Sequence, residues 1–168
     1  MKKTLDVLNK LLREKVINDY AIGGAMGAMF YVEAVTTMDL DIFVLFPDEN
    51  SFTPLAPVYE KLKEWGYFPD AHERECVNIE GTPVQFLPAY DDLLQEALAF
   101  ARVFDYEGVS TKVMLAEYLA LICVKTGRMK DKLRVQMLMT SDGFSMKKFM
   151  ELLAKFKLTE RFESWKIQ

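Results

Sequence analysis

The segment from Tyr20 to Phe46 constrains the fold of this chain more than any other stretch of the sequence. It reads as a short apolar strand that ends at Gly23-Gly24, a helix of small and bulky apolar residues, and a second strand over residues 39–46. Alternate residues of a strand point to the same face, so Asp39 and Asp41 should lie side by side, roughly 6.5 Å apart by the rise per residue. Two such charges repel by about 3 kcal/mol at an effective dielectric of about 20, and a bound cation would remove that repulsion.

Mg²⁺ suits this pair of carboxylates, because proteins commonly hold it with one or two carboxylates, substrate phosphates and water. The Gly23-Gly24 turn offers backbone N–H groups and the positive end of a helix dipole, which together favour an anion. Each pattern alone has an ordinary explanation: a solvated strand end for Asp-x-Asp, and a tightly packed helix for the segment rich in Gly and Ala. In this order, about fifteen residues apart by the sequence numbering, they jointly predict a site for Mg²⁺ and phosphate groups.

The order of Gly23-Gly24, a helix, and then Thr-Thr-Met-Asp-Leu-Asp-Ile over residues 36–42 resembles the signature of the nucleotidyltransferase superfamily, which has the DNA polymerase β-like fold. It is similar in particular to the small prokaryotic branch near the AbiEii-type toxins. The resemblance implies a Mg²⁺-dependent enzyme that transfers a nucleoside monophosphate from an NTP to a hydroxyl acceptor on a protein, an RNA or a small molecule. It implies that Asp39 and Asp41 are the catalytic metal ligands. It also implies a candidate toxin of a toxin–antitoxin pair, with a separate antitoxin protein as partner.

Residues 117–138 carry a second resemblance to this family, in which a helix ends in a Lys, a short turn bears Arg or Lys, and an Asp opens the next helix. Lys125, Arg128, Lys130 and Asp131 occupy those positions. The resemblance implies that Lys125 and Arg128 bind the nucleotide together with Gly23 and Gly24, and Arg suits bidentate contact with phosphate. An ordinary explanation stays open. Cations near a helix C-terminus interact favourably with the negative end of its dipole, and Asp131 could simply cap the next helix.

The family's third carboxylate lies on a neighbouring strand, at the position that aligns here with Gln85. Glutamine is neutral and cannot accept a proton from a hydroxyl near neutral pH. Glu75, Glu80 or Asp91-Asp92 could take its place if the alignment shifts, although each also reads as a solvated turn or a helix cap. The alternative function is therefore a catalytically degenerate nucleotidyltransferase fold that acts as a nucleotide-binding or regulatory module.

Hydrophobic periodicity and turn residues predict the elements along the chain. Helices are predicted over residues 4–17, 24–34, 58–65, 91–100, 115–126, 130–140, 145–156 and 159–166, and extended segments over residues 20–22, 39–46, 67–68, 75–80, 83–87, 102–106 and 109–114. This order indicates an α+β fold with a nucleotidyltransferase-like mixed β-sheet core, flanking helices and a C-terminal helical bundle. We expect residues 1–114 to form the core and residues 115–168 to form a helical region packed on it.

The bulk properties argue against several classes of protein. The net charge of −4 over 168 residues and a pI near 5.2 disfavour a broad nucleic-acid-binding face. No apolar run approaches the roughly 18 residues of a membrane span, and residues 1–15 read as a charged amphipathic helix, so we expect a cytoplasmic protein with no membrane contact. The single histidine, His72, has no nucleophile motif near it, and Cys76 and Cys123 lack a metal-binding context, which leaves zinc unsupported.

The C-terminal helices are rich in methionine, at positions 137, 139, 146 and 150. Methionine fills irregular gaps in a core and is also common at contact surfaces. The sequence therefore leaves open whether these residues are core or the face of a homodimer.

Overall fold

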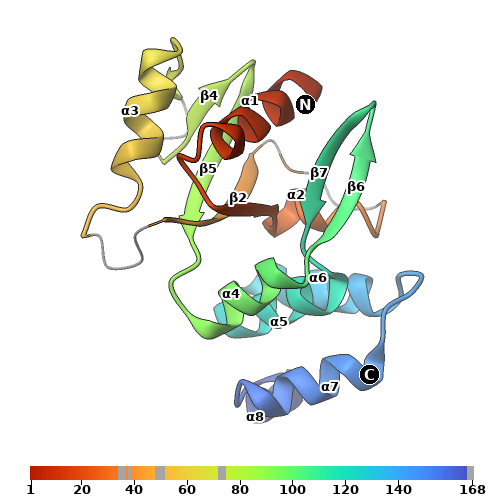
Figure 1. Cartoon of the computed structure of the whole chain (residues 1–168). Helices are drawn as coiled ribbons and strands as arrows, with labels where there is room; N and C mark the ends of the chain where they lie inside the picture. Colours follow the sequence, from red (N-terminus) through yellow and green to blue (C-terminus); the bar gives the residue numbers. More distant parts are fainter. Residues whose placement is uncertain (34–36, 38, 48–51, 72–74, 166–168) are drawn as a thin grey trace.

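The computed structural model of the chain describes residues 1–33, 37, 39–47, 52–71 and 75–165 (Figure 1). Its helices are α1 Lys2–Arg13, α2 Gly24–Ala28, α3 Ala56–Glu64, α4 Asp92–Ala99, α5 Ala116–Thr126, α6 Met129–Met139, α7 Met146–Lys155 and α8 Thr159–Ser164. Its strands are β1 Asp19–Ile22, β2 Leu40–Leu45, β3 Phe68–Pro69, β4 Val77–Ile79, β5 Thr82–Pro88, β6 Arg102–Tyr106 and β7 Val109–Val113.

The described strands form one seven-stranded sheet in the order β3-β4-β5-β2-β1-β7-β6. Strand β2 pairs with β5 in parallel, and β1 pairs with β7 in parallel, whereas the other neighbours are antiparallel. The predicted α+β class, with a mixed sheet and flanking helices, is therefore confirmed. Strand β2 lies in the middle of this sheet, so its residues can be covered from both faces.

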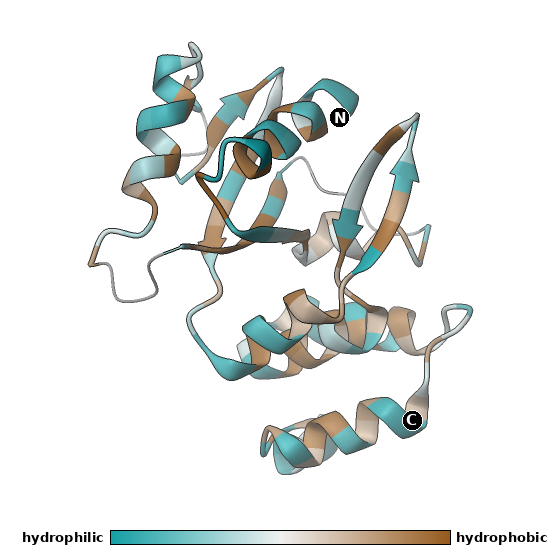
Figure 2. Ribbon diagram, viewed as in Figure 1, coloured by the Kyte–Doolittle hydropathy of each residue, from teal (hydrophilic) through white to brown (hydrophobic). Residues whose placement is uncertain are grey.

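Helices cover the two faces of the sheet (Figure 1). Leu40, Ile42 and Val44 of β2 are completely buried on the face that packs against α1 and α3. Phe43 points the other way, into a cluster built largely from α4, α5, α6 and α7. Figure 2 shows β2 mainly in hydrophobic colours, while α1 and α3 carry hydrophilic residues among the hydrophobic ones. Because alternate strand residues share a face, Asp41 lies on the same side as Phe43, beneath α5 and α6.

Helix α2 has only five residues, Gly24–Ala28, and is therefore shorter than the helix predicted over residues 24–34. The aromatic side chains that follow make long-range contacts instead. Phe30 and Tyr31 pack edge-to-face against Phe104 of β6, with ring centroids 5.2 Å and 6.0 Å away. The Tyr31 hydroxyl also donates a hydrogen bond of 3.0 Å to the Met114 carbonyl. The sequence pattern could not reveal these partners, which lie more than seventy residues along the chain.

Helix α1 also ends earlier than predicted, at Arg13 rather than at residue 17. Lys15 adopts a left-handed conformation with φ of 56°, and the Val16 N–H donates to the Leu11 carbonyl at 3.0 Å. This pairing is the Schellman arrangement that closes a helix C-terminus. The remaining predicted helices and both hairpins are confirmed to within a few residues.

Several smaller features of the described part of the chain bear on the expectations from the sequence. Cys76 and Cys123 are both buried and not joined in a disulfide, and burial raises the pKa of the Cys123 thiol to about 11. No described helix is both long and apolar enough to cross a membrane. His72 lies outside the described residues, and the domain boundary at residue 114 stays a prediction.

Candidate functional site

The Gly23-Gly24 turn and Asp41 are in direct contact. The Gly23 N–H donates a hydrogen bond of 2.9 Å to the Asp41 carbonyl. Gly24 has a φ of +56°, and a Cβ atom added there would lie 1.7 Å from Oδ2 of Asp41. A Cβ on Gly23 would lie 2.4 Å from the Phe43 ring. Glycine is therefore needed at both positions for β2 to lie this close to the turn. With only five residues in α2, the predicted anion site at this turn stays a prediction.

The two predicted carboxylates lie near each other at the start of β2. Asp39 immediately precedes the strand, and its Oδ1 accepts a hydrogen bond from the Thr37 hydroxyl. Burial raises the pKa of Asp41 to about 6, and the negative charge of Asp39 adds to the increase. The two charges thus oppose each other at a partly buried position, where a cation would relieve the repulsion.

Two arginines from α6 and the turn before it form the opposite wall. Arg128 and Arg134 line a cavity of about 230 Å³ together with Gly24, Asp41 and Gln85. The positive charges of both arginines lower the pKa of Asp41 and offset part of the increase. The cavity is smaller than the roughly 300–1,000 Å³ of typical small-molecule sites. Its size suits a metal ion with phosphate groups rather than a whole nucleotide.

Asp131 holds the two arginines in place from beneath the cavity. It is completely buried, and its Oδ2 accepts hydrogen bonds from the backbone N–H and the Nε of Arg128, both at 3.0 Å. Nη1 of Arg134 lies 3.6 Å from Oδ1 of Asp131. The sequence pattern indicated Asp131 as a candidate cap, but Arg134 was missed. The spacing of Arg134 three residues after Asp131 could have revealed it, since residues three apart on a helix are neighbours on its surface.

Lys125 does not line the cavity that contains Asp41. Its ammonium group binds the Asp91 carboxylate and lies 5.8 Å from the centroid of the Tyr90 ring. It lines an adjoining cavity of about 370 Å³, which shares four residues with the first: Phe43, Leu87, Ile122 and Thr126. The structure therefore places the predicted nucleotide-binding residues Arg128 and Gly24 around one cavity and Lys125 beside its neighbour.

The C-terminal helix α8 contacts the turn between these two cavities. Nη1 of Arg161 donates a hydrogen bond of 2.8 Å to the Lys125 carbonyl, and Nη2 donates one of 3.3 Å to the Thr126 carbonyl. Gly127 has a φ of +75°, and a Cβ there would lie 1.9 Å from the Arg161 guanidinium. The end of α5 is thus capped by a side chain from the last described helix.

Gln85 occupies the strand position beside Asp41. The parallel register of β2 and β5 pairs the two residues directly. Nε2 of Gln85 donates a hydrogen bond of 2.6 Å to Oε2 of Glu75. The other candidates for the third carboxylate lie elsewhere: Glu80 accepts from the Tyr67 hydroxyl, Asp91 caps α4, and Asp92 lies in the first turn of that helix. Of the four candidates, Glu75 is the carboxylate that the structure places against Gln85.

Oxygen donors at this site fit a divalent metal ion that completes its shell with phosphates. Within the described ranges, no three His, Cys, Asp or Glu side chains are arranged to hold a metal by themselves. Asp39 and Asp41 supply two carboxylates, and the absence of a Cβ at Gly24 allows the Asp41 carboxylate to pack directly against the turn. Mg²⁺ commonly binds through one or two carboxylates plus substrate phosphates, and this arrangement agrees with that preference.

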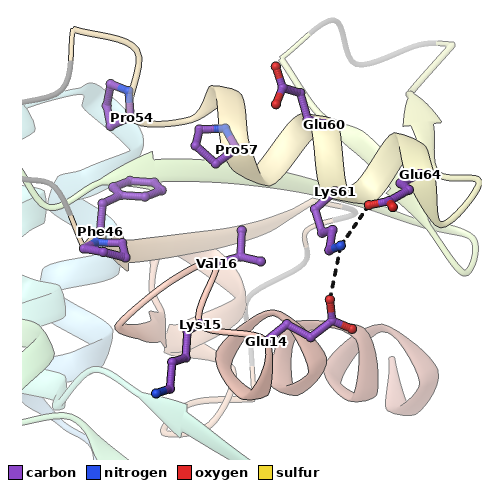
Figure 3. Close-up of a pocket in the computed structure, with 10 residues that line it drawn as sticks. Glu14, Lys15, Val16, Phe46, Pro54, Pro57, Glu60, Lys61 and Glu64 are labelled. Carbon is purple, nitrogen blue, oxygen red and sulfur yellow. Dashed lines mark hydrogen bonds and ion pairs between the residues drawn. The ribbon is translucent and has the colours of Figure 1, made fainter.

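A larger cavity, of about 690 Å³, lies elsewhere, between the end of α1 and α3 (Figure 3). Lys61 lies at its edge and forms ion pairs with Glu14 at 3.4 Å and Glu64 at 2.8 Å. Val16 and Phe46 are apolar residues of its lining. Two of its three acidic side chains, Glu14 and Glu64, are paired with Lys61, and it belongs to the face of the sheet opposite Asp41. Cavity size alone therefore does not identify the site.

We expect Asp41→Asn to raise the free energy of unfolding near pH 7.5. The pKa of Asp41 is raised to about 6 in the folded chain, whereas an unfolded aspartate titrates near pH 3.9, so the native state binds the proton more tightly. The stabilisation from this proton is full below about pH 4 and is lost as the pH rises through about 6. At about 1.4 kcal/mol per pKa unit, the loss is at most about 3 kcal/mol, and the neutral asparagine avoids it.

Urea unfolding of wild type and Asp41→Asn between about pH 4 and pH 8 measures this effect. The difference in the free energy of unfolding should grow up to about pH 7 and then become constant. Asp6→Asn is a matched control, because Asp6 is exposed on α1, on the opposite face of the sheet. A difference that does not change with pH would contradict the raised pKa of Asp41.

Comparisons with known proteins identify the fold. No protein-family profile matches the sequence, and no curated protein sequence matches it.

The chain is similar in structure to an antigenic nucleotidyltransferase-like protein from Paracoccidioides brasiliensis, with 14% identity, a TM-score of 0.57, and coverage of 97% of this chain and 93% of that one. It is also similar to ANT(2″)-Ia in complex with adenylyl-2″-tobramycin, with 15% identity, a TM-score of 0.55, and coverage of 93% and 98%. The solution structure of the antibiotic-resistance factor ANT(2″)-Ia gives a TM-score of 0.53 at 13% identity, over 96% and 94% of the chains. These similarities show that the chain has the fold of nucleotidyltransferase-like proteins over nearly its whole length.

Proposed function

We propose that this chain is a Mg²⁺-dependent nucleotidyltransferase that transfers a nucleoside monophosphate from an NTP to a hydroxyl acceptor. The observation that carries the proposal is the cavity in which Asp41 and the Gly24 turn face Arg128 and Arg134. This combination places anionic metal ligands opposite cationic phosphate ligands. It occurs in a chain whose fold extends over nearly all of a protein bound to an adenylylated small molecule.

Asp39 and Asp41 would hold the metal ion beside the Gly24 turn. Mg²⁺ at this position supplies a Lewis acid that neutralises charge on the transferred phosphoryl group. Arg128 and Arg134 bind the phosphate oxygens, and the guanidinium fork suits two oxygens at once. In the reaction, the acceptor hydroxyl releases its proton to solvent as its oxygen forms a bond to the α-phosphorus. The bond from the α-phosphorus to the oxygen that bridges to the β-phosphate breaks, and pyrophosphate leaves with its charge balanced by the arginines.

The adjoining cavity offers space for the rest of the nucleotide. It is lined by Tyr90, Lys125 and the apolar side chains that it shares with the first cavity. An aromatic ring and a cation beside a phosphate site can contact a base and a phosphate, respectively. We therefore retain Lys125 as a nucleotide-binding residue, acting from this second cavity.

The acceptor is a hydroxyl on a small molecule, an RNA or a protein. The similarity to ANT(2″)-Ia, which is bound to adenylyl-2″-tobramycin, supports a small molecule. The resemblance of the Gly-Gly and Asp-x-Asp segments to the AbiEii-type branch instead supports a toxin that acts in the cytoplasm of a prokaryote and is held in check by an antitoxin.

A second candidate function rests on Gln85. Because the register pairs Gln85 directly with Asp41, the neutral side chain occupies the position where the family resemblance implies a carboxylate. General base catalysis contributes roughly 10²- to 10⁴-fold to a rate. A chain without that base could bind a nucleotide and act as a binding or regulatory module.

We expect isothermal titration of each NTP to show binding that requires Mg²⁺ and is weakened at least tenfold in the Asp39→Asn/Asp41→Asn double variant. The amide groups keep the shape of the carboxylates but remove both charges that would hold the cation. Asp6→Asn, on the other face of the sheet, is the matched control and should bind as wild type does. Equal binding by wild type and the double variant would contradict the proposed site.

Product analysis with α-³²P-labelled NTP separates the two candidate functions. Release of pyrophosphate together with label on an added acceptor would support the transferase. Mg²⁺-dependent binding without any transfer, over a panel of aminoglycosides, tRNA and cell protein, would support the binding module.

A further inference from the structure

The hydrogen bond between Gln85 and Glu75 fixes the orientation of the Gln85 amide. An ionised carboxylate can only accept hydrogen bonds, so the atom 2.6 Å from Oε2 of Glu75 must be the amide nitrogen of Gln85. The amide oxygen is then on the side of the group turned away from Glu75. Because Gln85 lines the same cavity as Asp41 and is its direct partner in the register, this oxygen is available to a cation held by Asp41.

We infer that the amide oxygen of Gln85 is a neutral ligand of the metal ion, and that Glu75 is the positioning residue that presents it. The inference rests on the proposed function. Amide oxygens of Asn and Gln are established ligands for hard divalent cations. A carboxylate that accepts a hydrogen bond from the opposite side of a ligand orients that ligand and increases its basicity.

This arrangement changes the charge of the site. Asp39 and Asp41 bring two negative charges and Gln85 brings none, so the side-chain ligands balance one divalent cation. A second divalent ion at the same cluster would find no third carboxylate to bind it, while Arg128 and Arg134 already face the cavity. The site therefore holds one metal ion per nucleotide. Arg128 and Arg134 neutralise the phosphate charge that a second metal ion would otherwise neutralise.

Mn²⁺ binding measured by electron paramagnetic resonance tests this assignment. The protein is titrated with Mn²⁺ in the presence of the α,β-methylene analogues of ATP, GTP, CTP and UTP, which cannot undergo transfer. For wild type we expect one Mn²⁺ per bound nucleotide. We expect Glu75→Gln to weaken Mn²⁺ binding about tenfold, the lower end of the effect of removing the orienting partner of a metal ligand.

The double variant Glu75→Gln/Gln85→Ala distinguishes positioning from a general charge effect. If Glu75 acts through the Gln85 amide, the double variant binds Mn²⁺ as Gln85→Ala alone does. Glu80→Gln is the matched control, because Glu80 belongs to the same hairpin but accepts its hydrogen bond from Tyr67, and it should bind as wild type does. Gln85→Glu should raise the ratio to two Mn²⁺ per nucleotide, because it restores a third negative charge.

Each outcome has a defined meaning. If wild type binds Mn²⁺ with nucleotide and Asp41→Asn does not, but Glu75→Gln binds as wild type, this inference fails while the proposed function stands. Effects of Glu75→Gln and Gln85→Ala that multiply in the double variant also overturn it, as does a ratio of two for wild type. Absence of any Mn²⁺ and nucleotide binding in wild type overturns the proposed function itself.

Discussion

Asp131→Ala should destabilise the protein by roughly 3–5 kcal/mol, the effect of removing one partner of a buried ion pair, here the pair of Asp131 with Arg134. Asp131 is completely buried and accepts three hydrogen bonds from Arg128, at 3.0, 3.0 and 3.3 Å. Arg134, whose side chain is only 12% exposed, loses the same partner. The start of α6 also loses the acceptor for the Arg128 N–H, which a helix N-terminus needs. Urea unfolding near pH 7.5 measures the loss.

Asp91→Ala is the matched control for this variant. Asp91 also caps a helix, by accepting the Leu94 N–H at 3.0 Å, and also binds a cation, Lys125. Its side chain is 24% exposed, however, and that of Lys125 is 40% exposed, so water can replace what is lost. We expect about 1 kcal/mol for Asp91→Ala, typical of a lost cap. Equal effects of the two variants would contradict the importance of burial at Asp131.

Gly24→Ala should destabilise the protein by about 2–5 kcal/mol and weaken nucleotide binding. The left-handed backbone at φ +56° costs an alanine roughly 1–2 kcal/mol. The added Cβ would lie 1.7 Å from the Asp41 carboxylate, and displacing packed atoms costs typically about 1–3 kcal/mol more. Serine at this position meets the same backbone and the same neighbour, so Gly24→Ser should behave as Gly24→Ala does.

Two further variants separate backbone strain from contact with Asp41. Gly66 has a φ of +87° with no atom within 4 Å of an added Cβ, so Gly66→Ala should show the backbone effect alone, about 1–2 kcal/mol. In the Gly24→Ala/Asp41→Ala double variant, the change in the free energy of unfolding should be smaller than the sum of the two single-variant changes. The carboxylate that Gly24→Ala displaces is already absent there. Additive effects would show that Asp41 is not the group in contact.

Local patterns in the sequence predicted most of the elements, because turn residues and hydrophobic periodicity act over short distances. Gln85 lies on the strand beside Asp41, and its equivalence to the third carboxylate of the family stays a prediction. The predicted end of α2 was wrong, because Phe30 and Tyr31 find their partner on β6. Arg134 and the hydrogen bond from Gln85 to Glu75 were missed for a related reason: each depends on which side chains a tertiary contact brings together.

The two walls of the cavity come from segments far apart in the chain, the turn and strand around Asp41 and the turn before α6 that carries Arg128. Contacts between such distant segments form late in folding, because the loop between them must close first. During synthesis, a nascent chain that ends at β7 already contains every strand that the structure describes and both carboxylates, Asp39 and Asp41, but neither arginine of the opposite wall. Nucleotide binding should therefore appear only when the last third of the chain has left the ribosome and docked, so that the acidic half of the site is made first and stays inactive until then.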